Sequence, residues 1–136
     1  MTPWSGCPSS STGSDADVAR LIASATRIPV PGGKTIDEHV GAVNSGDDHV
    51  SIARMVAPAG WDEPAQSPEF EELTLVLRGR LLVEHEGGVL EVGAGQAVVA
   101  QPGERVRYST GPDEGAEYVA VCLPAFTPDR AHRHDD

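Results

Sequence analysis

Glycine and proline divide the chain into short apolar runs, and this spacing restricts the fold more than any other feature of the sequence. The 15 glycines and 11 prolines separate runs that are too short for ordinary helices. Gly87-Gly88, between two such runs, is typical of a β-hairpin. The pattern predicts an all-β sandwich or barrel with strands over 49–57, 72–78, 80–86, 89–92, 96–101, 104–109 and 117–123.

The two ends of the chain differ in composition from this central part. Ser14-Asp15-Ala16-Asp17 follows a leader rich in Ser, Gly and Pro and resembles a helix cap, so we expect a short helix through Ala25. An edge strand over 34–43 is expected after it. His132-Arg133-His134 resembles a metal-binding tract, but a mobile tail is the simpler interpretation. We therefore expect a leader with a helix over 1–26, a barrel over 27–126 and a polar tail over 127–136.

The charge balance disfavours several classes of partner. A formal net charge of −11 repels nucleic-acid phosphates and anionic membrane surfaces, so neither is expected as a partner. Cys7 and Cys122 are too few and too far apart for a disulfide framework, and Cys122 lies in an apolar run typical of a buried thiol. The first residues show no basic segment followed by an apolar one, so we expect a cytoplasmic protein.

Two spaced motifs resemble those of the cupin superfamily. The first reads Gly60-x5-Gln66-Ser67-Pro68-x3-Glu72-x6-Gly79, where cupins have His-x-His in place of Gln66-Ser67-Pro68. The second reads Gly95-x5-Gln101-Pro102-Gly103-x2-Val106-x3-Thr110, where cupins have histidine in place of Val106 and asparagine in place of Thr110. The glycines and Glu72 match, whereas Gln66, Pro68 and Val106 replace the three metal-binding histidines.

Within the superfamily, the segments 72–79, 85–87 and 118–125 are similar to the ethanolamine-utilisation (EutQ-type) branch. The likeness covers about residues 27–134. It implies a double-stranded β-helix of two packed antiparallel sheets that holds a small molecule inside the barrel and forms a homodimer. It does not define a reaction, because one fold supports many activities.

The substitutions at the histidine positions argue against the usual cupin metal. Proline and valine side chains cannot coordinate a metal, and Gln66 is a weak neutral donor. His39, His49 and His85 could rebuild a ligand set around Glu72. The sequence therefore predicts no cofactor, and a non-standard divalent metal site remains the alternative.

The orientation of Glu72 decides whether it can act in catalysis. Residues 72–78 alternate, with the leucines on one face and Glu72, Thr74 and Val76 on the other. Periodicity alone would bury the leucines and expose Glu72, whereas the cupin register points Glu72 into the barrel. We favour the inward orientation, in which burial would raise the pKa of the carboxyl group toward the range useful for acid–base chemistry.

Further residues are candidates for the same site. On the cupin register Tyr108 faces inward and could assist proton transfer, or it could simply line the barrel. Arg54 lies in an apolar run, where it could pair with Glu72, bind a substrate anion or be exposed. Trp61 could stack on a ligand at the barrel mouth or close that end by packing. Gln66, Thr74 and Val106 complete the predicted substrate-binding set, and the acidic residues near Trp61 are expected to be solvated.

Three functions are compatible with these features. The first is a metal-independent enzyme that isomerises, eliminates or cyclises a small polar metabolite, with Glu72 as acid or base and Tyr108 assisting. The second is a non-catalytic ligand-binding or scaffold protein in which Glu72 pairs with Arg54. The third is a metalloenzyme with a non-standard ligand set.

Overall fold

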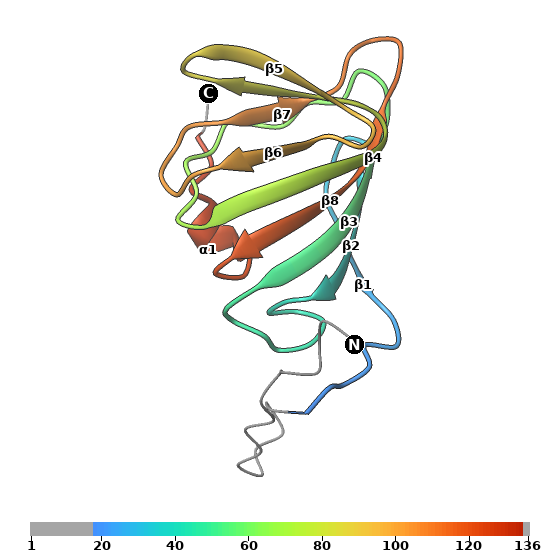
Figure 1. Cartoon of the computed structure of the whole chain (residues 1–136), viewed down its shortest axis with the longest axis vertical. Coiled ribbons are helices and arrows are strands. Elements are labelled where there is room, and N and C mark those ends of the chain that lie inside the picture. Colours follow the sequence, from blue (N-terminus) through green and yellow to red (C-terminus); the bar gives the residue numbers. More distant parts are fainter. Residues whose placement is uncertain (1–17, 135–136) are drawn as a thin grey trace, which may run out of the picture.

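One long strand, β4 (Glu71–His85), belongs to both sheets of the structure. The computed structural model describes residues 18–134. The first part of β4 pairs with β8 and β6, and its second part pairs with β5 and β7, all antiparallel. Figure 1 shows β4 crossing the molecule between these neighbours. The partners are β5 (Gly88–Gly93), β6 (Ala97–Ala100), β7 (Arg107–Ser109) and β8 (Ala116–Leu123).

The first sheet continues beyond β8 toward the N-terminus. Its strand order is β1-β2-β3-β8-β4, with β1 (Thr26–Ile28), β2 (Thr35–Val40) and β3 (Ser51–Ala57). The predicted strand over 34–43 is thus β2, but the edge position is taken by β1. The core between the sheets includes Val76 from the first sheet and Leu81 and Val83 from the second. An all-β antiparallel architecture is confirmed.

Gly79 explains why β4 can serve both sheets. The sequence predicted two strands separated at this glycine, whereas the structure continues the strand through it and bends there. Gly79 has a φ of 75°, and a Cβ atom at this position would lie 2.0 Å from the carbonyl oxygen of Gly115. Only glycine permits both the positive φ and this close backbone approach.

The N-terminal helix prediction is wrong for the residues that the structure describes. Residues 18–25 contain no helix, and the proposed cap at 14–17 lies outside the described residues. Val18 and Leu21, part of the expected apolar stripe, are 64% and 87% exposed. A short helix is unstable unless its apolar face packs against something, so the stripe alone was not sufficient.

The prediction of a mobile tail is also wrong as far as His134. Thr127 caps a short helix, α1 (Pro128–Ala131), and Ala131 is fully buried. Backbone bonds then join Arg130, His132 and His134 to the segment 65–69. Figure 1 shows α1 beside one end of the barrel, near the ends of β4 and β8. No helix within residues 18–134 is long and apolar enough to cross a membrane.

Candidate active site in the barrel cavity

A cavity of about 170 Å³ lies against the inner face of the first sheet, and Tyr108 of β7 contributes to its wall from the second sheet. Part of its space comes from Ala53 and Ala120, which are paired across β3 and β8 and carry very small side chains. One region of the wall is apolar, with Ile28, Val30, Ile36, Met55 and Phe126. The charged and polar residues of the wall include Lys34, Glu38, Glu63, Gln66, Glu72, Tyr108 and Arg133.

Glu72 lies on the inner face of β4 and opens onto this cavity. The strand alternation buries Glu72, Thr74 and Val76 and leaves Leu75 and Leu77 exposed, which is the inward orientation. The Tyr108 hydroxyl, on β7 of the opposite sheet, donates a 3.1 Å hydrogen bond to Glu72 Oε1.

Burial is the largest influence on the pKa values of Glu72 and Tyr108. It raises the pKa of Glu72 to about 7, helped by the negative charge of Glu63 and opposed by the Tyr108 hydrogen bond and by Lys34. Burial and the neighbouring Glu72 carboxylate also raise the pKa of Tyr108. Glu72 can therefore give or accept a proton near neutral pH, while Tyr108 remains a neutral donor.

Lys34, immediately before β2, places an ammonium group in the same cavity. Its Nζ lies 4.2 Å from the centroid of the Trp61 ring, 5.3 Å from that of Tyr118 and 3.8 Å from Glu63 Oε2. Cation–π attraction and the Glu63 carboxylate favour the charged form. Burial opposes them and lowers the pKa of Lys34, and burial also raises the pKa of Glu63.

Gln66 and Arg133 are neighbours in the cavity wall. Reciprocal 2.9 Å backbone hydrogen bonds hold Gln66 against Val106, and a bridge on its other side holds Arg133. The Gln66 amide is buried and makes no hydrogen bond to any residue between 18 and 134. The C-terminal segment thus contributes a cationic side chain to the wall.

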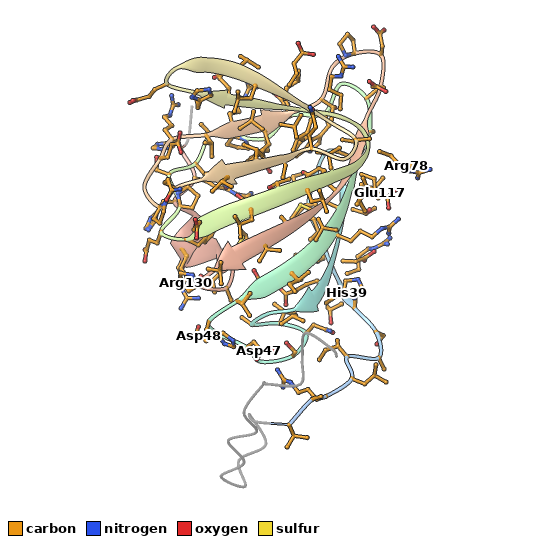
Figure 2. The ribbon with its side chains drawn as sticks, viewed as in Figure 1. His39, Asp47, Asp48, Arg78, Glu117 and Arg130 are labelled. Carbon is orange, nitrogen blue, oxygen red and sulfur yellow. The ribbon has the colours of Figure 1, made fainter. Side chains whose placement is uncertain are left out.

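Arg54 does not line the cavity, so its predicted pairing with Glu72 is wrong, and it takes the exposed strand position that was the alternative. Its side chain is 44% exposed on the outer face of β3 and pairs with Glu117 at 2.6 Å. Arg78 binds the other oxygen of Glu117 at 2.8 Å, and Figure 2 shows these two residues together on the outside of the barrel. The shared carboxylate satisfies both arginines without any ligand.

Three other predicted binding residues pack in the interior without lining the cavity. Trp61 is a buried core residue whose ring lies 4.2 Å from the Lys34 Nζ. Val106 is also part of the core. Thr74 is buried, and its hydroxyl has no partner among the described residues.

The histidines do not rebuild a metal site around Glu72. His39, labelled in Figure 2, and His49 are exposed, and His85 accepts a backbone hydrogen bond from Gly87 at the β4–β5 turn. None of them lines the cavity. Within residues 18–134 no group of three or more His, Cys, Asp or Glu side chains could hold a metal ion. The donor set at the cupin motif positions therefore does not fit a metal.

Several cavity residues were missed by the sequence analysis. Lys34 could have been found, because in the predicted strand over 34–43 it shares a face with Ile36. Glu63, expected to be solvated, lies in an irregular segment where no periodicity indicates its direction. Burial and the Glu72 carboxylate raise the pKa of Cys122, also in the wall, which keeps its thiol unreactive.

Comparison with solved structures establishes the fold. The polyketide cyclase RemF from Streptomyces resistomycificus superposes with a TM-score of 0.69 at 19% identity over 88% of this chain and 87% of that one. An RmlC-like cupin from Shewanella frigidimarina gives 0.64 at 14% identity over 74% and 85%. The Streptomyces protein PAC13, solved with uridine, gives 0.67 at 16% identity over 85% and 88%. The chain therefore has the cupin fold that its motif spacing predicted.

Sequence comparison finds a relative whose name differs from those of the structural neighbours. No protein-family model matches the chain. A protein of Myxococcus xanthus named endoribonuclease YbeY is 45% identical over 105 residues, which is 77% of this chain. The match spans 36% of that protein, so the chain covers only about a third of its length.

Proposed function

We propose that the chain is a small-molecule enzyme that uses metal-independent acid–base chemistry in the barrel cavity. Isomerisation, elimination or cyclisation of a small metabolite would fit, since each can proceed by moving a proton at carbon. The observation that carries the proposal is Glu72, a buried carboxyl group with a pKa of about 7 that opens onto a largely apolar cavity. A carboxyl group in this state can take a proton from one atom and return it to another.

Other cavity residues would support this chemistry. Tyr108 would hold the Glu72 carboxyl group in place by its hydrogen bond, and its raised pKa keeps its own proton on the phenol. Gln66 would orient a polar group of the substrate. The cyclase name of RemF, a neighbour in fold, is compatible with a reaction of this class. Membership of the EutQ-type branch and a cytoplasmic location belong to the same proposal.

Replacing Glu72 tests the mechanism directly. Small aldehydes and ketones incubated with the protein in D2O should exchange the hydrogen next to the carbonyl group, and NMR can follow the exchange. Glu72→Gln should slow this exchange roughly 100-fold or more, because it removes the acid–base group and keeps the shape.

Glu71→Gln is the matched control, since this neighbouring carboxylate lies on the opposite face of β4 and should leave the exchange unchanged. Exchange that continues at the wild-type rate in Glu72→Gln would exclude Glu72 as the acid–base group.

The Myxococcus relative favours a second candidate, a ligand-binding unit without catalysis. Ribonucleases bind an anionic polymer, whereas this chain has a formal net charge of −11. The endoribonuclease activity in that protein's name would then belong to the part that this chain does not match. In such a protein the barrel would bind a small molecule beside the catalytic part.

A ribonuclease assay on the purified chain separates the possibilities. Both candidates predict no RNA cleavage, and the second also predicts saturable small-molecule binding with no hydrogen exchange. An RNA-cleaving activity that copurifies with the chain would contradict both candidates.

A further inference from the structure

Lys34 is a buried cation whose contact with the Glu63 carboxylate is longer than a good hydrogen bond. An ammonium group has three N–H donors, and buried donors are almost always paired. The residue is only 8% exposed, and Glu63 is the carboxylate within residues 18–134 that forms an ion pair with its Nζ. Its nearest carboxylate oxygen, on Glu63, lies 3.8 Å away, which is an ion-pair distance.

The side-chain amide of Gln66 is buried as well and makes no hydrogen bond with residues 18–134, and both groups line the same cavity. Trp61 and Tyr118 support the Lys34 charge through their ring faces but supply no acceptor oxygen to it. Much of the remaining cavity wall is apolar. Such a wall fits a molecule with an oxygen group at one end and an apolar body at the other.

Five ionisable side chains of Lys, Arg or Glu line the cavity: the cations Lys34 and Arg133 and the carboxyl groups of Glu38, Glu63 and Glu72. The Glu38 carboxylate accepts hydrogen bonds from the backbone of Val43 and Asn44. When Glu72 has taken a proton, the two cations balance the two remaining carboxylates. The negative charge formed on a bound molecule in the same step would then lie beside Lys34.

We propose that the cavity binds a small carbonyl compound with an apolar body, and that Lys34 and Gln66 donate hydrogen bonds to its carbonyl oxygen. The proposal rests on the proposed acid–base function and identifies the substrate class. A cavity of about 170 Å³ suits a body near the size of benzene, since an engineered cavity of roughly 150 Å³ accepts benzene.

The reaction step balances without a cofactor. The Glu72 carboxylate takes the proton from the carbon next to the carbonyl group, and the C–H bond breaks. Its electron pair forms a C=C bond, and the carbonyl oxygen becomes an enolate oxygen beside the Lys34 ammonium. The negative charge thus moves from Glu72 to the oxygen, where a fixed cation stabilises it.

Three probes of one shape test this site by calorimetry. Benzoate presents an anionic oxygen group, benzamide a neutral one and benzamidine a cation. Wild-type protein should bind benzoate at least tenfold more tightly than benzamide and should not bind benzamidine. Lys34→Met should remove the preference for benzoate, while Arg54→Met, which changes a cation on the outer face, should preserve it.

A measurement on the unaltered protein covers the case in which Lys34→Met does not fold. Benzoate should shift the NMR resonance of the Lys34 ε-methylene group in the wild-type chain. Equal binding of benzoate and benzamide, no binding of either, or no shift at Lys34 would each overturn the proposal. Borohydride trapping of a benzaldehyde adduct on Lys34 would also overturn it, because Lys34 would then act covalently.

These readouts separate the two proposals, because they measure binding and use no turnover. Glu72→Gln should retain the preference for benzoate even though it loses hydrogen exchange. A benzoate site that depends on Lys34, together with exchange that does not depend on Glu72, would remove the proposed function and keep the oxygen-binding site.

Discussion

Side chains of the same charge lie in opposite environments in this protein, because some face the barrel interior and others face water. Glu71 and Glu72 are neighbours in β4, yet only Glu72 faces the cavity. Lys34, immediately before β2, and Arg54, in β3, are both cations, and only Lys34 is buried. A carboxyl group or an ammonium group gains useful chemistry here by being withdrawn from water.

The pH dependence of stability should reveal the buried carboxyl group. The pKa of Glu72 is about 7 in the folded chain against 4.5 as its ordinary value, so the folded state keeps a proton that the unfolded chain has released. The stabilisation from this bound proton is fully present below pH 4.5, the pKa of the group in the unfolded chain. It is lost as the pH rises through about 7, the pKa of the group in the folded chain. The free energy of unfolding should therefore fall by up to roughly 3 kcal/mol across this range.

Urea unfolding at several pH values measures this fall. Glu72→Gln should lose most of it, because the amide does not titrate, while Glu71→Gln should retain it. An identical pH profile for wild type and Glu72→Gln would show that Glu72 is not perturbed.

At the scale of elements, β4 determines the architecture because it joins both sheets through one glycine. Gly79→Ala should destabilise the protein by more than about 3 kcal/mol, since it combines a positive φ with a backbone clash. Gly60→Ala is the matched control, because Gly60 has a φ of 73° and open space around it. That change should cost only about 1 kcal/mol. Similar costs for both variants in denaturant unfolding would contradict the role of the close approach.

The pairing of β3 with β8 provides the cavity, because Ala53 lies opposite Ala120 on the inner face. Ala120→Leu should occupy this space and abolish benzoate binding while the chain stays folded. Ala97→Leu, on the exposed face of β6, should leave the binding unchanged. Calorimetry and circular dichroism on both variants test this expectation, and normal binding by Ala120→Leu would show that the ligand lies elsewhere.

At the scale of the whole molecule, the outer side of the first sheet is unusually apolar. Leu75, Leu77, Val99 and Leu123 are between 39% and 50% exposed. Strand register brings them together through Leu73, which pairs with both Val99 and Val121. Soluble proteins usually cover a patch of this kind, and we propose that a second copy of the chain covers it, as in the expected homodimer.

Sedimentation of the purified chain measures this association. Leu75→Glu should dissociate the dimer, because it introduces a charge into the centre of the apolar face. Val89→Glu, which changes an exposed apolar residue on β5, should leave the association unchanged. A monomeric wild-type chain would contradict the proposal.

The sequence alone predicted most of the strands and the cupin fold, because glycine spacing and period-two alternation are local properties of the chain, but it missed β1 and divided β4 at Gly79. The same motif spacing also indicated that Glu72 faces inward. Only the tertiary structure decided what surrounds Glu72. It brought Tyr108 from the opposite sheet, placed Lys34 and Glu63 beside it, directed Arg54 to Glu117 and packed the C-terminal segment against residues 65–69. These contacts join residues far apart in the chain, so they depend on how the sheets close and not on any local pattern.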